Sequence, residues 1–331
     1  MISRRFLLKS APLIGVAAGI SAKLSWAAAV SSDNFATRLT FIPPKGSCDC
    51  HVHVFEPDTF PFAEARVYTP DRASVSDLER HLNELHMDRV VLIQPSPYGT
   101  DNRCMLNAIK MLGQQRARGV AVVDDDISLQ ELKQLHEQGI RGLRLNMEAR
   151  AGGKLSAEES SAYLKKMAAK ISSLGWHLQI YTNLHEIAAL SETLTQLPVP
   201  VVIDHLGKLK AEEGTAQPGF SELLSLLESG KVYVKLSALY RVTKDTTWNN
   251  VKPFIAALVS RKPDRLIWAS DWPHTMPAPG KKRTREGIEY FYPVDDISIL
   301  NAFGDWLQTE ALRTQIFVTN PRQLYWADKT I

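Results

Sequence analysis

The sequence predicts a single-domain α/β protein of the (βα)8 TIM-barrel class, and three observations lead to this prediction. Eight short runs of β-branched and apolar residues alternate with longer segments of helical periodicity. The chain has 331 residues, of which 44% are hydrophobic, and this is enough for the core of one barrel. Polar or charged residues end many of the predicted strands, and barrel active sites collect at that rim. This last feature favours a barrel over a doubly wound sheet, which the alternation alone also permits.

The elements follow one another in a regular order along the chain. The predicted strands are 47–53, 89–94, 119–123, 142–146, 176–181, 199–205, 232–237 and 265–271. Helices are predicted at 75–86, 129–137, 157–173 and 220–228, where apolar residues recur at helical spacing. The segment from Pro273 to Pro293 is rich in proline, glycine and basic residues, which indicates a long loop over the barrel mouth. The sequence leaves open whether this loop is a lid or a surface excursion.

The first 29 residues have the layout of an export signal. Arg4 and Arg5 precede an apolar stretch at 11–20, and small residues at 27–29 form a cleavage site. The paired arginines resemble a bacterial twin-arginine signal, which predicts a periplasmic location. The apolar run is too short for a comfortable transmembrane helix. An uncleaved anchor or a chance basic start is the alternative interpretation. Residues 30–45 are then predicted to be a linker and residues 46–331 the barrel.

The charge of the chain gives no reason to expect a nucleic-acid partner, or a membrane partner after signal cleavage. The sequence has 39 Lys and Arg residues against 36 Asp and Glu residues. The four basic residues of the signal more than account for this excess, so the basic character belongs to the leader. The sequence does not indicate an oligomeric state.

Three motifs place groups with catalytic chemistry at strand ends. His51 and His53 are two residues apart on the first predicted strand, so both imidazoles point the same way, into the barrel. His205 ends the sixth predicted strand, and Asp271 follows the eighth just before a proline. A carboxylate at that position suits a general base. Each residue alone is often a cap or turn residue, but the three motifs together are much more specific.

Four basic residues are also predicted to lie on the same rim. Arg144 lies in the last part of the fourth strand and Arg150 follows in its loop, while Lys208 and Arg241 follow the sixth and seventh strands. Single basic residues in loops are usually solvated. Four that converge on the rim of a chain with a nearly neutral mature part predict a small anionic substrate, because arginine forks suit carboxylates.

In these motifs the chain resembles the amidohydrolase superfamily, most closely its branch of 2-pyrone-4,6-dicarboxylate lactonase-like enzymes. The resemblance covers roughly residues 46–326. It is carried by DCHVHVF at 49–55, QPSPYGTDN at 94–102, GIRGLRLN at 139–146, VIDHLG at 202–207, VKLS at 234–237, ASDWPH at 269–274 and NP at 320–321. The resemblance implies that arginines matching Arg144, Arg150 and Arg241 bind substrate carboxylates. It also implies polar contacts from Tyr68, Ser96 and Tyr181. The family has an arginine where this chain has Lys208, so the charge is kept but the bidentate fork is lost.

The resemblance leaves two interpretations of the histidines. Many members of the superfamily bind a divalent metal, and zinc would use His51, His53, His205 and Asp271. In this chain the fourth strand ends in Asn146 without a lysine, and the fifth ends in Tyr181 where a metal-binding member places histidine. His177 and His185 lie before and after that position. The lactonase branch shares this pattern and works without metal. We therefore expect no cofactor, with zinc as the alternative.

The predicted function is a hydrolase that acts on ester bonds and opens a carboxylate-bearing lactone. Asp271 activates water, the three histidines polarise the carbonyl, and the basic residues hold the carboxylates. The alternatives are a lactone isomerase on the same scaffold, a zinc-dependent amidohydrolase or decarboxylase, and a periplasmic binding protein without turnover. Asp271 argues against a pure binder, because a buried anion facing an anionic ligand only weakens binding.

Overall fold

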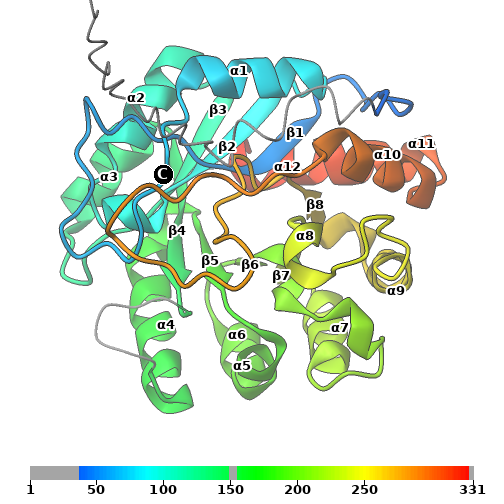
Figure 1. Ribbon diagram of the computed structural model, residues 1–331. Helices are drawn as coiled ribbons and strands as arrows, with labels where there is room; N and C mark the ends of the chain where they lie inside the picture. The colour runs from blue at the N-terminus through cyan, green and yellow to red at the C-terminus, as the bar shows by residue number, and fades with distance from the viewer. Residues whose placement is uncertain (1–36, 149–154, 328–331) are drawn as a thin grey trace, which may run out of the picture. The chain divides into compact units, whose positions relative to one another are not determined.

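The computed structural model describes residues 37–148 and 155–327. Its centre is a parallel sheet of eight strands in the order β1 to β8 (Figure 1). The predicted signal, residues 1–29, lies outside the described residues. The strands are β1 (Cys48–Val52), β2 (Arg89–Ile93), β3 (Ala117–Ala121), β4 (Ile140–Asn146), β5 (His177–Tyr181), β6 (Val201–Ile203), β7 (Val232–Leu236) and β8 (Leu266–Trp268).

Hydrogen bonds between the two edge strands close the sheet into a barrel. The backbone N–H of His53 donates to the carbonyl of Trp272 at 2.9 Å, and the N–H of Asp271 donates to the carbonyl of His51 at 3.0 Å. Val52 and Trp272 form a parallel bridge at the same place. The predicted (βα)8 class is therefore confirmed, and the closing bonds bring His51, His53 and Asp271 together at one end of the barrel.

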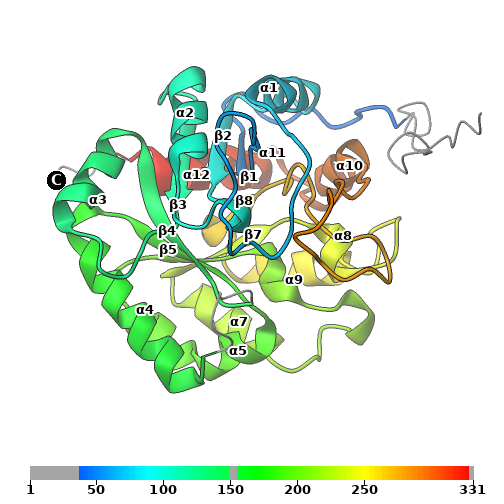
Figure 2. The ribbon, with the colours of Figure 1, turned by 60° about the vertical axis from the view of Figure 1, so that its left-hand side comes forward.

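Helices surround the strands on the outside, as Figures 1 and 2 show. Several of them begin with a Ser whose hydroxyl accepts from the third helical N–H while the acidic side chain there bonds back, as at Ser74, Ser128 and Ser156. The helices are α1 (Val75–Glu84), α2 (Arg103–Leu112), α3 (Leu129–Glu137), α4 (Ala157–Ile171), α5 (Leu184–Ala189), α6 (Ser191–Gln196), α7 (Phe220–Glu228), α8 (Leu239–Val242), α9 (Lys252–Arg261), α10 (Asp296–Trp306), α11 (Glu310–Thr314) and α12 (Asn320–Tyr325).

Short single-turn helices complete the chain path. They are η3 (Ser96–Tyr98), η4 (Ser172–Leu174), η5 (His205–Lys208), η6 (Ala211–Glu213), η7 (Pro263–Arg265) and the π-helical turn η8 (Gln315–Thr319). η3 directly follows β2, and η5 directly follows β6. Both therefore contribute to the rim at which the strands end.

The core has two layers, because side chains alternate between the two faces of each strand. The large outer layer lies between the strands and the helices. The smaller inner layer fills the barrel below the site and includes Cys48, Cys50, Val91, Val202 and Ile267. All three cysteines are buried and free.

A bulge in β1 decides which of its residues face the barrel interior. Asp49 pairs with Val90, but Val52 pairs with Leu92, so β1 has one residue more than β2 over this stretch. The extra residue shifts the alternation of side chains by one position. Cys50 and His51 can therefore both face inward, and Asp49 faces outward toward His81 of α1, whose Nε2 lies 3.6 Å from the carboxylate.

Residues 37–45, which belong to the predicted linker, contact α10. The N–H groups of Thr40 and Phe41 donate to the side-chain oxygen of Asn301 at 2.8 and 3.1 Å. The Phe41 ring is buried, and its centroid lies 5.8 Å from that of Phe317. Residues from Thr37 onward form one compact unit. Among the described residues no helix is long and apolar enough to span a membrane.

Candidate active site

The site lies where the strands end, and its central group is the carboxylate of Asp271. Its Oδ1 faces the Nε2 atoms of three imidazoles: His205 at 3.5 Å, His51 at 3.6 Å and His53 at 3.9 Å. All four side chains are at most 5% exposed. The four residues that the motifs singled out on the first, sixth and eighth strands therefore converge on one point.

Two of these residues have an unusual backbone conformation. His205 has a φ of 50° and Asp271 has a φ of 71°, which is the left-handed region that non-glycine residues rarely adopt. Both lie immediately beyond the strand end, where the chain turns away from the barrel. Such strain persists only where surrounding contacts hold it, and it concentrates at functional sites. Here it turns the two side chains back over the barrel axis.

The other oxygen of Asp271 is held by two residues of α8. The Tyr240 hydroxyl donates to Oδ2 at 2.6 Å, and the Arg241 Nε donates to the same atom at 2.8 Å. Burial opposes ionisation of Asp271, but its electrostatic interactions with His205 and with the Arg241 guanidinium outweigh it and hold its pKa well below the usual value. Asp271 is therefore a carboxylate whose Oδ1 faces the histidines.

A fully buried ion pair supports the histidines from below. The Lys235 ammonium lies 3.3 Å from Asp204 Oδ1, and it donates to Gln179 Oε1 at 2.8 Å and to His51 Nδ1 at 3.1 Å. Burial opposes the ionisation of Asp204, but the positive charge of Lys235 outweighs it and holds the pKa of Asp204 well below its usual value. Arg144 Nε lies 3.5 Å from the other oxygen of Asp204.

These contacts determine which histidine nitrogens carry hydrogen. His51 Nδ1 lies 3.1 Å from the Lys235 ammonium, which can only donate, and 3.3 Å from Asp204 Oδ1, which can only accept. We assign the hydrogen of His51 to Nε2 on the shorter contact. His53 donates from Nδ1 to the carbonyl of Ile93 at 2.8 Å, so its Nε2 has a lone pair. His205 shares a hydrogen bond of 2.8 Å between Nδ1 and the Ser237 hydroxyl, which serves as donor or acceptor. His51 and His53 therefore present opposite hydrogen-bonding character to Asp271.

The three imidazoles are neutral at neutral pH. Burial, followed by the charge of Arg144, lowers the pKa of His53 to about 3. Burial lowers the pKa of His205 to about 4, against the opposing effect of Asp271. Burial and the neighbouring Lys235 hold the pKa of His51 well below its usual value. The cluster therefore combines one carboxylate with three uncharged rings.

A cavity of about 230 Å³ opens above these groups. His53, His205 and Asp271 form its floor, and Arg144 and Arg241 reach it from opposite parts of the barrel. Tyr68, Ser96 and Tyr181, which the resemblance predicted as contact residues, also line it, together with Asn146, Glu148 and Arg283. Sequence-predicted residues at or just beyond the ends of seven strands thus meet around one cavity.

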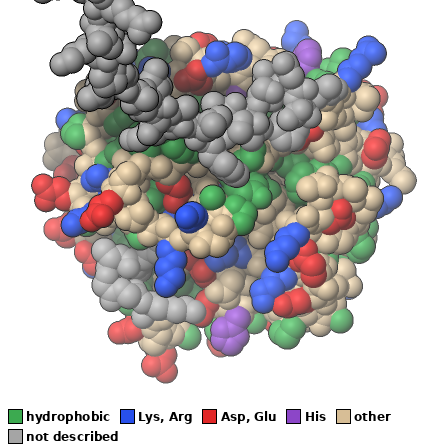
Figure 3. Space-filling view, viewed as in Figure 1, with side chains coloured by type: hydrophobic (Ala, Val, Ile, Leu, Met, Phe, Trp, Pro, Cys, Tyr) green, Lys and Arg blue, Asp and Glu red, His purple; other side chains and the backbone are tan. Residues whose placement is uncertain are grey.

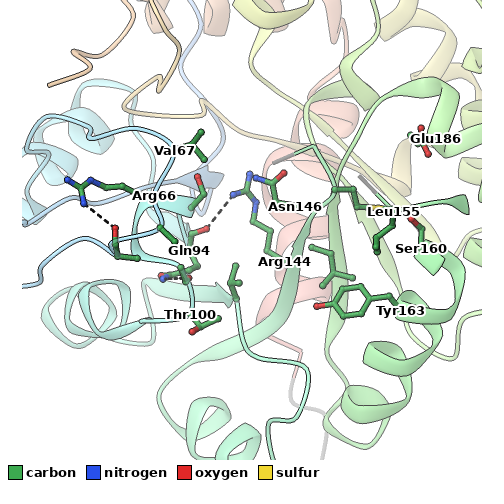
Figure 4. A pocket seen from close by; sticks show the side chains of 17 residues that line it. Arg66, Val67, Gln94, Thr100, Arg144, Asn146, Leu155, Ser160, Tyr163 and Glu186 are labelled. Carbon is green, nitrogen blue, oxygen red and sulfur yellow. Dashed lines mark hydrogen bonds between the residues drawn. The ribbon is translucent and has the colours of Figure 1, made fainter. Parts of the chain in front are cut away.

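A second cavity of about 340 Å³ adjoins the first over β2 to β5. The two share Val67, Ser96, Arg144 and Asn146 in their linings. Figure 4 shows Arg144 between Gln94 and Asn146, with a bond from its guanidinium to the Gln94 carbonyl at 3.4 Å. Arg144 therefore lies at the boundary between the two cavities.

Of the two remaining predicted basic residues, the structure describes Lys208, which is paired with an acidic side chain. The Lys208 ammonium is paired with the carboxylate of Glu148 and lies 5.2 Å from the centroid of the Tyr181 ring. Arg150 lies outside the described residues. On the face seen in Figure 3, basic and acidic side chains are interspersed.

His177 and His185 lie away from the catalytic histidines. His177 begins β5 and its ring centroid is 5.2 Å from that of Tyr325 in α12. Gly142 leaves room for it, since a Cβ there would come within 2.5 Å of the imidazole. His185 lies in α5. Tyr181 occupies the inner position at the end of β5 that a metal-binding histidine would need.

Four functional residues were not predicted as site residues. Lys235 and Asp204 form the buried ion pair, Tyr240 holds Asp271, and Arg283 enters the cavity from the loop after β8. One signal in the sequence was the single lysine in the apolar run VYVKL of β7. An isolated lysine in such a strand is costly to bury without a partner. Asp204 gave a similar signal, because it directly precedes His205.

The donor atoms only partly suit a metal ion. His51, His205 and Asp271 offer ligand atoms within 4.8 Å of one another. Catalytic zinc sites use three protein ligands, and a ligating imidazole nitrogen must have a free lone pair. The donation from Lys235 places a hydrogen on His51 Nε2, which removes His51 from this set, while His53 has a lone pair at Nε2, 3.9 Å from Asp271 Oδ1. The donors that remain are His53, His205 and Asp271, and His51 does not fit as a zinc ligand while Lys235 is charged.

The comparisons with known proteins agree with the geometry of this site. The family model described as amidohydrolase matches residues 48–326, which span the barrel from β1 to α12. The chain belongs to the amidohydrolase family. The predicted resemblance is thereby confirmed.

Three curated relatives act on lactones according to their names. A 2-pyrone-4,6-dicarboxylate hydrolase of Comamonas testosteroni is 34% identical, over 86% of this chain and 92% of its own. A 4-sulfomuconolactone hydrolase of Hydrogenophaga intermedia is 30% identical, over 87% and 91%. A D-galactarolactone isomerase of Agrobacterium fabrum is 25% identical, over 85% and 91%.

A solved structure gives the same result for the fold. It is a probable 2-pyrone-4,6-dicarboxylic acid hydrolase of Acinetobacter baumannii with citric acid bound. It is 29% identical to this chain, with a TM-score of 0.70, and the match covers 85% of this chain and all of the other. This amidohydrolase chain thus shares its barrel with an enzyme crystallised with a small polycarboxylate.

Proposed function

We propose that this amidohydrolase hydrolyses a lactone that bears a carboxylate group. The observation that carries the proposal is the arrangement of one ionised carboxylate, Asp271, with three neutral imidazoles, two of which (His53 and His205) lie with it at the floor of a cavity lined by arginines. Relatives at 34% and 30% identity are named as hydrolases of lactones that carry acidic groups. A floor whose one charge is the Asp271 carboxylate and walls that carry arginines suit an anionic cyclic ester, because the ester lies at the floor and its carboxylate at an arginine.

The proposed reaction begins with a water molecule beside Asp271. Oδ1 accepts a proton from this water while its oxygen attacks the lactone carbonyl carbon. The tetrahedral intermediate forms, the ring C–O bond breaks, and the departing oxygen takes the proton from Asp271. The product is one open-chain molecule that carries the new carboxylic acid and a hydroxyl or enol group. Tyr240 and Arg241 hold Oδ2 throughout, so the reacting oxygen stays directed at the water.

The histidines take two different parts in this proposal. His51 donates from Nε2 and stabilises the oxyanion that develops on the carbonyl. His53 has a lone pair at Nε2, so it accepts a hydrogen bond from the attacking water. The sequence-based expectation gave all three histidines the role of polarising the carbonyl. The bond from His53 to Ile93 is the physical reason for the different assignment of His53.

We propose further that the reaction needs no metal ion. The tautomer that Lys235 imposes on His51 and the presence of Tyr181 at the end of β5 both support this. Purified protein treated with a chelator is expected to keep its turnover, and elemental analysis is expected to find well under one zinc per chain. Stoichiometric zinc together with loss of turnover on its removal would contradict the proposal.

The proposal is tested by replacing the carboxylate while keeping its shape. Asp271→Asn removes the base, and we expect kcat to fall about 10²- to 10⁴-fold on 2-pyrone-4,6-dicarboxylate or a related acidic lactone. Asp305→Asn, on the outer helix α10, is the matched control and is expected to leave kcat unchanged. Turnover of Asp271→Asn close to that of the unmodified enzyme would overturn the assignment.

For localisation we propose export through the twin-arginine route, on the sequence of residues 1–29 alone. Arg4 and Arg5 are the residues on which recognition by that route would depend. The full-length chain expressed in a bacterium with this route is expected in the periplasmic fraction, and a variant with both arginines replaced by lysine is expected in the cytoplasm. Equal distribution of the two forms would contradict the proposal.

A further inference from the structure

One wall of the catalytic cavity is built by two loops that are joined to each other. They are the loop from β1 to α1 and the loop from β8 to α10, which lie side by side in Figure 1. The Glu289 N–H donates to the Thr69 carbonyl at 2.7 Å, and the Thr69 hydroxyl donates to the Arg285 carbonyl at 2.7 Å. These bonds fix the side chains of the two loops relative to the cavity.

Arg283 projects from this wall into the cavity. Its guanidinium carbon lies 3.9 Å from the centroid of the Tyr68 ring, and its side chain is 28% exposed. It donates from Nη2 to the Thr275 carbonyl, and the same atom lies 3.3 Å from Glu289 Oε1. A guanidinium carries five N–H donors, which is more than these two contacts use.

Arg241 meets Arg283 at the same carbonyl oxygen. Arg241 Nη2 donates to the Thr275 carbonyl at 2.9 Å, so two cationic groups converge on one neutral acceptor. Two positive charges this close repel each other, and each guanidinium has one carboxylate beside it that offsets part of this repulsion: Asp271 at Arg241, and Glu289 at 3.3 Å from Arg283. The carboxylate on Arg241 is Asp271, which also faces the three histidines. An oxyanion from a ligand would satisfy both guanidinium groups at once.

We propose that Arg283 is a specificity-determining residue, which together with Arg241 binds an oxyanion substituent of the substrate. In a closed barrel of eight strands β4 lies opposite β8, so Arg144 of β4 faces this pair across the cavity. A substrate with two anionic groups would thus span the cavity with its ester over the histidines. The inference rests on the proposed lactone hydrolysis for the position of the ester, but the oxyanion site itself is defined by the two arginines.

The first test compares two substrates that differ by one carboxylate. Arg283→Gln is expected to raise the KM for 2-pyrone-4,6-dicarboxylate about 10- to 100-fold, which is the effect of losing a hydrogen bond to a charged group. Its kcat and its KM for a 2-pyrone monocarboxylate are expected to change less than threefold. Arg283→Lys keeps the charge without the bidentate fork. Its KM for the dicarboxylate is expected to lie between those of the unmodified enzyme and Arg283→Gln. Arg285→Gln, an exposed charge on the same loop, is the control and is expected to match the unmodified enzyme.

A merely structural role for Arg283 would give a different pattern. If the substitution disordered the loop from β8 to α10, it would lower kcat for both substrates alike and would reduce the melting temperature. The reason is that this loop also carries the backbone groups of Arg285 and Glu289 that bond to Thr69. A similar loss on mono- and dicarboxylate therefore overturns the proposal, as does an unchanged KM for the dicarboxylate.

The second test measures binding without turnover. Calorimetry with benzene-1,3-dicarboxylate, 3-sulfobenzoate and benzoate uses ligands that have no ester to cleave. The unmodified enzyme is expected to bind at least one of the two dianions more tightly than benzoate, and Arg283→Gln is expected to remove that preference. The dianion whose affinity falls more in Arg283→Gln identifies the oxyanion as carboxylate or sulfonate. Retained preference overturns the role of Arg283, whereas binding without hydrolysis of any lactone overturns the proposed function alone.

Discussion

Replacement of Lys235 by methionine tests how the buried ion pair controls the histidines. Methionine keeps most of the aliphatic stem and loses only the ammonium group. The ammonium lies 3.3 Å from Asp204 Oδ1 and both side chains are fully buried. At an effective dielectric constant of about 20, two charges at this distance attract by about 5 kcal/mol. Removal of one partner from a buried pair costs about 3–5 kcal/mol, because the remaining charge is left uncompensated. We expect a loss of unfolding free energy in this range for Lys235→Met.

The same substitution is expected to lower turnover through His51. Without the ammonium, the group nearest to His51 Nδ1 is Asp204 Oδ1 at 3.3 Å, which can only accept. The hydrogen of His51 then moves to Nδ1, and Nε2 loses the donor that we assign to the oxyanion. Loss of one such donor lowers kcat about 10²- to 10³-fold.

The assays separate the two effects. Urea unfolding measures stability, and kcat on an acidic lactone measures the donor. The double variant with Asp204→Asn is expected to recover about 1–3 kcal/mol relative to the sum of the single losses, because no uncompensated charge remains. Lys210→Met, whose side chain is 72% exposed, is the control and is expected to change stability by less than about 0.5 kcal/mol. A Lys235→Met variant with kcat within threefold of the unmodified enzyme would refute the tautomer reasoning.

Three further predictions concern protonation and positioning. First, kcat/KM is expected to show no acid limb between pH 5 and 7, because the pKa of Asp271 is depressed and those of His53 and His205 are about 3 and about 4; a limb near pH 6.5 would contradict this. Second, Tyr240→Phe is expected to lower kcat about tenfold with little change in KM, because Oδ2 of Asp271 loses a donor at 2.6 Å; an equal change in KM would point to substrate binding instead. Third, burial opposes protonation of His81, but Asp49 and Asp296 outweigh it and raise its pKa. Because the pKa of His81 is higher in the folded than in the unfolded protein, its protonation stabilises the fold fully below about pH 6.5. This stabilisation is lost as the pH rises through the folded pKa. Chemical unfolding should therefore show a larger loss of unfolding free energy for His81→Phe at pH 6 than at pH 9. An equal loss at both pH values would argue against the interaction of His81 with Asp49 and Asp296.

Much of the site was predictable because strand ends carry local signals. His51, His53, His205 and Asp271 each follow or end an apolar run, and in a barrel all strand ends meet at one rim. The predicted first and last residues of the strands were less accurate. β3 runs from Ala117 to Ala121, two residues before the predicted 119–123, because Arg118 is a polar residue in the strand. Its guanidinium bonds to the carbonyl of Tyr325, which the local pattern does not show.

The remaining site residues depend on contacts between distant segments. Lys235 has a role only because Gln179 and Asp204 lie beside it on neighbouring strands, and no spacing along the chain reveals that. Arg283 depends on the pairing of two loops whose residues are more than 200 positions apart. The bulge in β1 is likewise a matter of register between two strands, so the alternation of one strand does not contain it.

Hydrolysis in water enriched in oxygen-18 tests the central claim most directly. The account predicts that the product of an acidic lactone is an open-chain acid with one labelled oxygen in its new carboxylate, and that Asp271→Asn forms this product far more slowly. An unlabelled product with the ring retained or closed elsewhere would instead show a lactone isomerase on this scaffold, and would contradict the assignment of Asp271 as the base that activates water.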